Sequence, residues 1–472
     1  MAAADEFLGR SPLDVFDELR EAYFRYYDTP FRLADYTLNE ERRGLLNQPG
    51  GVWQEPLLEL RPRYRSEQSS IAETILDAGA DAAVAEVAEL GLFAGIPSMY
   101  QHQAAAFRAA CSGQDVLVTA GTGSGKTETF LLPILASLLQ ESNSWSGPSA
   151  GDNIWWRSEG APWVSQRTGE SGSRPTAMRA MILYPMNALV DDQLVRLRQA
   201  LTSHPVMDWL NRNRGGHRFY FGRYTGSTPV LGNSRNGRQV ARLRSILSRN
   251  ERLLKAAKEN RRPGLEFFVA NPTSSEMRSR WDMLDAVPDV MITNYSMLNV
   301  LLMRQRDQRL FESTKEWLAG DSRRVFTLVV DELHMYRGTA GTEIAYLLRN
   351  LRNRLGLSDY PDRFRILAAS ASLHPTRDVD FIRDFFAKEE PFTVVEGSLV
   401  ESTHHAAGLQ EHREIFETGE FFSAGEADHI LEQTSADEVV AGALTDKHGN
   451  PLTLSWTEVA RKLFGSGGDV ES

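Results

Sequence analysis

The sequence predicts an α/β protein built on a doubly wound parallel sheet, with a helical N-terminal region, two insertions and a small C-terminal helical region. Two observations lead to this prediction. Short apolar runs alternate with helical segments between about residues 115 and 372. These runs are apolar throughout, which is typical of strands that are covered on both faces. A chain of 472 residues with 42% hydrophobic content can form such a core and has room for two or three domains.

The expected elements follow one another in a regular order. The strands are expected at 115–120, 180–185, 289–294, 326–331 and 365–372. The helices between them are expected at 126–140, 187–201 and 341–356. Gly356 closes the last of these, as glycine commonly does at helix ends. Ahead of this region, Ser11 and Pro12 mark the start of one helix, and residues 70–90 favour a second.

Changes in composition divide the chain into three expected regions. They are an N-terminal helical region (1–90), the main α/β domain (91–400) and a C-terminal extension (401–472) that could begin a further domain. Two polar stretches, about 142–175 and 211–288, interrupt the main domain and are interpreted as insertions. In the extension, Ser455 and Glu458 have the spacing of a capping box at a helix start.

The charge and cysteine content restrict the class of protein. The net charge of -11 argues against a simple basic nucleic-acid-binding protein. However, the segment from Arg196 to Arg262 holds 16 Lys and Arg against 3 Asp and Glu, which indicates either a phosphate-facing surface or a solvated helix face. Cys111 is the single cysteine, so no disulfide can form within the chain, and no secretory signal or membrane span is visible. A cytoplasmic protein without a membrane partner is expected.

The strongest motif is a glycine-rich loop between an expected strand and an expected helix. From Ala120 the sequence reads A-x-x-x-x-G-K-T, which predicts a P-loop that binds the phosphates of ATP. Glycines let successive backbone N–H groups turn toward a phosphate, and the helix N-terminus adds positive potential. The alternative is a glycine-rich turn without a ligand. The residues expected to hold the nucleotide are Thr122, Gly123, Ser124, Gly125, Lys126 and Thr127.

Two acids end the apolar run 326–330. In a P-loop protein a second strand ends beside the phosphates and supplies an acid for the metal, so Asp331 and Thr127 are the expected Mg²⁺ ligands. Glu332 is then placed to orient or deprotonate the attacking water. Lys126 is expected to neutralise phosphate charge. The alternative for the acid pair is a solvated turn.

The P-loop and the sequence Asp331-Glu-Leu-His334 together resemble the DEAD/DEAH-box helicases of superfamily 2. The resemblance covers about residues 93–397 and implies a RecA-like ATPase domain that uses ATP and Mg²⁺ and acts on nucleic acid, with DNA favoured over RNA. It also implies that Gln103 contacts adenine and that His334 joins the catalytic set. Ser370 and Ser372 match the motif that couples hydrolysis to movement.

The same resemblance assigns residues to nucleic acid. Segments 184–193, 224–228 and 293–298 resemble the motifs that grip one strand in these helicases. The residues implied to do so are Asn187, Gln193, Thr225, Gly226, Thr293, Asn294 and Tyr295.

Finer features narrow the resemblance to the YprA/Lhr-like group of large bacterial helicases. They are the segments 184–189, 276–283 and 331–351. Some members of that group belong to anti-phage defence systems such as DISARM or Druantia, so protein partners in a defence complex are a further expectation. No arginine-finger motif is visible, and a second RecA-like domain or subunit is therefore expected as a partner. Without it, this chain is expected to bind ATP and hydrolyse it slowly.

Two functions remain open at this point. The first is an ATP-driven helicase or translocase component. The second is a nucleotide-gated module that binds nucleic acid or a protein without translocation. A P-loop kinase fits less well, because Asp-Glu-x-His and the later Ser-Ala-Ser favour a helicase.

Overall fold

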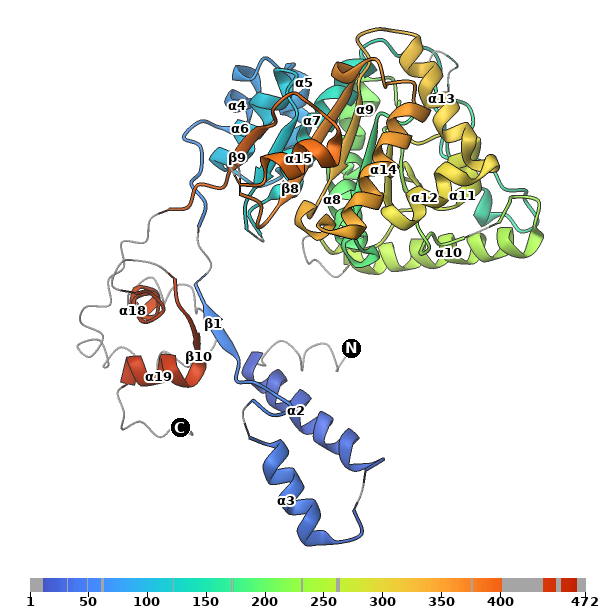
Figure 1. Ribbon diagram of the computed structural model, residues 1–472. Helices are drawn as coiled ribbons and strands as arrows, with labels where there is room; N and C mark the ends of the chain where they lie inside the picture. Colours follow the sequence, from blue (N-terminus) through green and yellow to red (C-terminus); the bar gives the residue numbers. More distant parts are fainter. Residues whose placement is uncertain are drawn as a thin grey trace. The chain divides into compact units, whose positions relative to one another are not determined.

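The chain divides into two compact units (Figure 1). The larger unit is Tyr64–Ser398, and the smaller unit combines Met1–Arg63 with Leu399–Ser472. The structure is a computed structural model. It describes residues 12–31, 33–48, 50–60, 63–121, 123–170, 172, 174–230, 232–259, 264–374, 377–400, 436–446 and 451–464.

The larger unit contains an eight-stranded sheet in which every neighbouring pair of strands is parallel. The strand order is β5-β4-β6-β3-β7-β8-β2-β9, so consecutive strands of the chain are joined by crossovers. The strands are β2 (Val116–Thr119), β3 (Ala180–Tyr184), β4 (Phe221–Arg223), β5 (Glu276–Met277), β6 (Val290–Asn294), β7 (Phe326–Val330), β8 (Phe364–Ser370) and β9 (Thr393–Glu396). The predicted α/β fold is confirmed.

Helices cover both faces of this sheet. Alternate residues of one strand enter two separate cores, as Ile182 and Leu183 of β3 do. This two-sided burial explains why the strands are apolar throughout. The helices are α4 (Ile71–Asp77), α5 (Ala82–Leu90), α6 (Gln101–Cys111), α7 (Lys126–Ser142), α8 (Asn187–Thr202), α9 (His204–Asn213), α10 (Gly237–Glu259), α11 (Arg280–Asp285), α12 (Tyr295–Met303), α13 (Gln308–Ala319), α14 (Thr339–Arg354) and α15 (Val379–Phe386).

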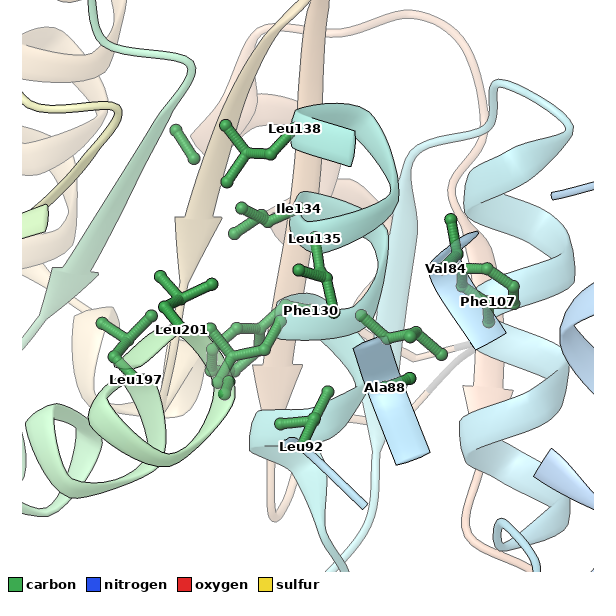
Figure 2. Packing of buried hydrophobic residues seen from close by; sticks show 14 of the residues in the cluster. Val84, Ala88, Leu92, Phe107, Phe130, Ile134, Leu135, Leu138, Leu197 and Leu201 are labelled. Atoms are coloured by element: carbon green, nitrogen blue, oxygen red, sulfur yellow. The ribbon is translucent and has the colours of Figure 1, made fainter. Parts of the chain in front are cut away.

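One of the two cores lies under α5, α6, α7 and α8. Figure 2 shows Phe130, Ile134 and Leu138 of α7 between the sheet and the side chains of the neighbouring helices, including Leu197 of α8. Burial of such side chains contributes roughly 1.5–3 kcal/mol each. This packing fixes the start of α7, where the glycine-rich loop ends.

The boundary expected at residue 90 differs from the division in the structure. Helices α4 and α5 belong to the larger unit, and Ile75 and Val87 are fully buried in the core that α7 shares. The alanine-rich face of α5 can be buried only by packing against other helices, which a composition change along the chain does not reveal. Ser70 caps α4, since Ser70 and Glu73 exchange hydrogen bonds.

The segment 211–288 is not wholly an insertion. Residues 221–223 and 276–277 join the sheet as β4 and β5, at one edge. Strands of three and two residues are too short to show a hydrophobic pattern. Gly222 is required in β4, because a Cβ there would lie 2.6 Å from the sulfur of Met283.

The remainder of this segment packs against the first insertion. Trp155 and Trp156, in the 3₁₀ turn η2 (Trp155–Arg157), form a small core with Leu243, Leu247 and Trp281. The tryptophans of the first insertion therefore serve packing. The larger segment supplies α10, the turn η3 (Leu265–Phe268) and α11.

Asp282 of α11 offers a test of this packing. It is buried, it accepts a hydrogen bond from the Ser165 hydroxyl at 2.6 Å, and burial raises the pKa of its carboxyl from 3.8 to about 7. Between these two values the folded chain holds a proton that the unfolded chain has released. The free energy of unfolding should therefore fall as the pH rises from about 4 to 7, by on the order of 2–4 kcal/mol. Asp282→Asn should flatten this dependence in urea unfolding at pH 5 and pH 8. The exposed Asp359→Asn is the control, and an Asp282 variant whose pH dependence matches the wild type would contradict this account.

The smaller unit is built from short elements. It contains α2 (Pro12–Asp28), α3 (Tyr36–Leu46), the antiparallel pair β1 (Leu57–Glu59) and β10 (Thr453–Ser455), α18 (Ala436–Ala443) and α19 (Trp456–Phe464). Pro12 begins α2 as predicted. The expected capping box is also present, since the Glu458 carboxylate accepts from the Ser455 N–H at 2.8 Å and the Glu458 N–H donates to the Ser455 hydroxyl at 3.3 Å. Most of the extension 401–472 lies outside the described residues. Among the described helices, none combines the length and apolarity needed to cross a bilayer.

Candidate active site

The candidate phosphate loop lies between β2 and α7, at the carboxyl edge of the sheet. Gly125 adopts a left-handed φ of 72° and immediately precedes α7. A Cβ at this position would lie 2.2 Å from Nε2 of Gln103, so both the backbone conformation and the space require glycine. The N–H groups of residues 123–125 form no hydrogen bond with another described residue, and the Ser124 hydroxyl is buried with no partner among the described residues. Thr122, the remaining candidate in this loop, lies outside the described residues.

Lys126 extends along the inside of the loop. Its Nζ donates to the carbonyl oxygens of Ala120 at 2.9 Å and Gly121 at 3.3 Å. The same ammonium lies 4.0 Å from Oε1 of Glu332, although the two residues are far apart in the sequence. The lysine is buried, so its charge is weakly screened by water. The structure therefore brings the loop and the acid pair together.

The acid pair lies where β7 ends. Asp331 continues the backbone pairing of β7 with β3, because its N–H donates to the Leu183 carbonyl at 3.2 Å. Glu332 adopts a left-handed φ of 51°, one of two such non-glycine residues in the described part of the chain. This conformation costs of the order of 1 kcal/mol for a side-chain-bearing residue and is concentrated at functional sites. It turns the backbone so that both carboxylates remain near the loop.

The environment of Asp331 opposes its ionisation. Burial first, and the neighbouring Glu332 charge second, raise the pKa of its carboxyl from 3.8 to about 6. The Glu332 N–H, which donates to Asp331 Oδ1 at 2.8 Å, and the Lys126 charge oppose this shift. A cation bound beside Asp331 would reverse the shift, because it would stabilise the carboxylate.

Strand β8 lies between β2 and β7 and joins their ends. The Ser370 hydroxyl lies 3.4 Å from Nδ1 of His334, which in turn lies 3.4 Å from Oε2 of Glu332. The Ser372 N–H donates to the Ser370 hydroxyl at 3.3 Å, and the Ala120 N–H donates to the Ser370 carbonyl at 3.1 Å. A continuous series of polar contacts thus runs from the loop through β8 to the acid pair.

Helix α6 and the residue Tyr64 support the outside of the loop. Gln103 Nε2 donates to the Gly125 carbonyl at 3.0 Å, which places this adenine candidate directly on the loop. His102 Nε2 donates to the Ser124 carbonyl at 2.8 Å, and burial lowers the pKa of His102, so the neutral imidazole is favoured. The Gly121 N–H donates to the Tyr64 hydroxyl at 2.9 Å. Sequence reasoning missed His102 and Tyr64. The histidine next to Gln103 was a usable signal, whereas nothing in the sequence near Tyr64 indicated its position.

Gln193 lies at the phosphate loop. Its Nε2 donates to the Thr127 hydroxyl at 3.0 Å, and its Oε1 is buried with no partner among the described residues. The structure therefore separates Gln193 from the other residues that the sequence assigned to nucleic acid. Its position on α8, nearly two turns beyond Asn187, turns its side chain toward α7.

The remaining nucleic-acid candidates lie on the other half of the sheet, where the neighbouring strands β4, β6 and β3 end. Asn294 Nδ2 donates to Asn187 Oδ1 at 2.8 Å, and Tyr295 begins α12 with its side chain 39% exposed. Gly226 is exposed as well. By contrast, Thr225 and Thr293 are fully buried, and the Thr293 hydroxyl donates to the Tyr224 carbonyl at 2.8 Å. These two side chains lie beneath the surface of this edge, where they support the backbone of the neighbouring strands.

The residues present fit ATP and Mg²⁺ by their chemistry. The loop offers free N–H donors and a buried ammonium to phosphate oxygens, and Thr127 and Asp331 offer the hydroxyl and carboxylate oxygens that Mg²⁺ prefers. The unpartnered Ser124 hydroxyl provides a further polar group at the same place.

Comparisons with known proteins identify related sequences. Residues 100–217 match the family model described as DEAD/DEAH box helicase. The chain is 32% identical over 434 residues to the Druantia protein DruE of Escherichia coli (strain UMEA 4076-1), a match that covers 82% of this chain and 22% of that protein. It is 27% identical over 139 residues to the uncharacterized ATP-dependent helicase MJ1574 of Methanocaldococcus jannaschii, covering 29% of this chain and 18% of that protein. The chain thus spans about a fifth of the length of these relatives.

Among solved structures, the chain is similar to the DUF1998 helicase MrfA bound to DNA and AMPPNP. The sequence identity is 19%, the TM-score is 0.40, and the match covers 77% of this chain and 34% of that one.

Proposed function

We propose that this chain carries a DEAD/DEAH box helicase domain of superfamily 2, and that it binds ATP with Mg²⁺ and uses ATP hydrolysis to move on or remodel nucleic acid. One observation carries the proposal. Lys126 of the glycine-rich loop and Glu332 of the acid pair lie 4.0 Å apart at the carboxyl edge of one parallel sheet. This edge is where α/β proteins of this class hold their ligands.

The proposed division of roles follows from the contacts. The loop N–H groups and Lys126 would hold the phosphates of the substrate ATP, and Gln103 would contact the adenine. Bound Mg²⁺, held by Thr127 and Asp331, would neutralise charge on the phosphate oxygens. Glu332 would orient the attacking water and accept its proton, since it is the less buried of the two acids and has no strand partner to restrict it.

We propose that Ser370 and His334 transmit the state of the nucleotide site. Both lie on the series of contacts that joins Lys126 to β8, and His334 contacts Glu332 directly. A change in the position of Glu332 would therefore displace residues of β8 and the backbone of Ala120. The Ser372 N–H, which donates a hydrogen bond to the Ser370 hydroxyl, extends this series of contacts. Gln193 would respond to a change in the position of the Thr127 hydroxyl, to which its side chain donates a hydrogen bond.

The proposed nucleic-acid contacts are Asn187, Asn294, Tyr295 and the exposed backbone at Gly226. They lie at or just after the carboxyl ends of the neighbouring strands β3, β6 and β4, whereas the nucleotide residues lie on the other half of the sheet. Contacts of this kind grip a backbone with little sequence preference. DNA remains the favoured substrate. We also propose that a second RecA-like domain or subunit completes the site, and that a Druantia-like defence complex is the biological setting, in line with the similarity to DruE.

Tyr295→Ala should weaken the binding of a single-stranded oligonucleotide, because an exposed aromatic ring at this edge can stack on a base. The expected loss is between about 5-fold and 150-fold, which corresponds to 1–3 kcal/mol per stacked base. Fluorescence anisotropy with a labelled strand measures it. Tyr346→Ala, which removes an exposed tyrosine from α14, is the matched control and should have no effect. Equal affinity of the Tyr295 variant and the wild type would remove Tyr295 from the proposed surface.

The function as a whole is tested by nucleotide binding and strand displacement. The wild-type chain should bind ATP in a Mg²⁺-dependent manner, and addition of the partner domain should give ATP-dependent strand displacement. Failure to bind ATP would overturn the proposal. ATP-dependent binding of nucleic acid without displacement, with the partner present, would instead favour a nucleotide-gated module.

A further inference from the structure

Helix α10 carries a row of arginines that the candidate site does not use. Its 23 residues follow the loop that contains Gly226 and form a long straight helix at the lower edge of the larger unit in the view of Figure 1. At 3.6 residues per turn, four of its arginines fall within about 80° of one another and extend about 21 Å along the helix. They are Arg238, Arg242, Arg249 and Arg252, all exposed, and are called the arginine row below.

The opposite side of α10 is anchored, so the direction of the arginine row is fixed. Leu243 and Leu247 are buried against Trp155 and Trp156. Arg244, which points to this side, donates to the Ala161 carbonyl at 2.5 Å. The helix therefore cannot rotate to bury the row without breaking the small tryptophan core.

The charge of the row is not neutralised within the chain. None of its four guanidiniums has an ion pair or hydrogen bond to another residue that the structure describes. The two acids of α10 are occupied elsewhere. Glu251 accepts from Arg157 Nε at 2.9 Å, and Glu259 lies 4.0 Å from Lys255. The row lies in the segment 196–262, which is strongly basic although the whole chain has a net charge of -11.

We propose that the arginine row binds the phosphate backbone of a nucleic-acid duplex, next to the edge that grips a single strand. Arginine matches phosphate geometry through paired N–H donors. A duplex presents one charge per about 1.7 Å, which a straight cationic stripe of this length can follow. Single-strand sites add aromatic platforms, whereas α10 contains no Phe, Tyr or Trp. Because α10 has no aromatic side chains on which bases could stack, we propose a duplex and not a single strand as its ligand.

This inference deepens the proposed function and rests on it in one respect, that the chain acts on nucleic acid. The row would hold the unopened part of the substrate, since the loop leading into α10 comes from the end of β4, where Gly226 lies. It needs neither ATP nor the acid pair. Binding by the row can therefore be measured without nucleotide.

The test is the salt dependence of duplex binding in the absence of nucleotide. Replacement of all four arginines of the row by glutamine should make the slope of log K against log[salt] less steep by about 2–4 and weaken binding at low salt by roughly tenfold or more. A blunt DNA duplex, a blunt RNA duplex and single-stranded DNA of equal length are compared by anisotropy. The loss should be largest for one of the duplexes, which identifies the source of the phosphates.

Two controls separate phosphate binding from general effects. Replacement of the four arginines by lysine keeps the charge and should retain most of the slope. Replacement of four other exposed cations by glutamine, with the same loss of charge, should leave the slope unchanged. The four positions for this second control are Arg309, Lys315, Arg323 and Arg383. Circular dichroism and thermal unfolding confirm that each variant is folded.

The outcomes distinguish this inference from the proposed function. If the glutamine variant binds ATP normally and its duplex binding has the same salt dependence as the wild type, the role of the arginine row is disproved and the proposed function is unaffected. The proposed role of the arginine row is also disproved if the glutamine variant binds only single-stranded DNA more weakly than the wild type does. If the wild-type chain binds no ATP, but the glutamine variant binds duplex more weakly than the wild type, the arginine row is supported and the proposed function is overturned.

Discussion

Glu332→Gln is expected to abolish ATP turnover while ATP binding is retained. The substitution preserves the size of the side chain and removes its negative charge and its ability to accept a proton from water. Loss of a positioned general base costs about 10²–10⁴ in rate. Binding should persist because the loop and Lys126 are unchanged. Removal of the Glu332 charge also removes one of the causes that raise the pKa of Asp331, so Asp331 should bind Mg²⁺ at least as well.

The measurement is steady-state hydrolysis beside equilibrium binding of a fluorescent ATP analogue. It is made on the chain together with the proposed second RecA-like domain, where turnover is expected to be fast enough to follow. Glu343→Gln, which neutralises an exposed acid of α14, is the matched control and should behave as the wild type. Turnover within tenfold of the wild type would falsify the assignment of Glu332 as the base. If strand remodelling survived while hydrolysis was lost, ATP binding alone would be the working step, and the gated-module function would be preferred.

Lys126→Met is expected to lower ATP affinity by about 10- to 100-fold. The Lys126 ammonium contacts the carbonyls of the loop, and charge-assisted hydrogen bonds contribute roughly 1.5–3 kcal/mol when they are shielded from water. Methionine keeps the length and most of the volume of lysine, so the packing around the side chain should be preserved. The Ala120 and Gly121 carbonyls lose a donor, and Glu332 loses its neighbouring charge.

Calorimetric titration with ATP and Mg²⁺ measures this loss, and thermal unfolding without nucleotide checks the fold. Lys315→Met, on the exposed face of α13, controls for the loss of a surface charge. Lys126→Arg keeps the charge and should bind more tightly than the methionine variant. If the folded methionine variant bound ATP as tightly as the wild type, the loop would not be the phosphate site.

The candidate site could be predicted from sequence to different extents in its parts. Gly125, Lys126 and Asp331 follow from local rules, because a glycine turn between strand and helix and an acid at a strand end have the same chemistry in any such fold. Gln193 shows the limit. Its segment resembles a nucleic-acid motif, but the turn of α8 points it at Thr127. Likewise, Thr225 and Thr293 are buried by the neighbouring strands, which a motif does not reveal.

By itself, the sequence determined the α/β class, the position of the candidate phosphate loop and the identity of the candidate acids, since these depend on the period of apolar residues and on residues close together in the chain. Only the tertiary structure decided that Lys126 and Glu332 lie 4.0 Å apart, that β8 joins them through Ser370 and His334, and that Tyr64 and His102 support the loop. The physical reason is the parallel sheet. Strand order and side-chain direction are set by burial on two faces at once, and that information is distributed over the whole chain.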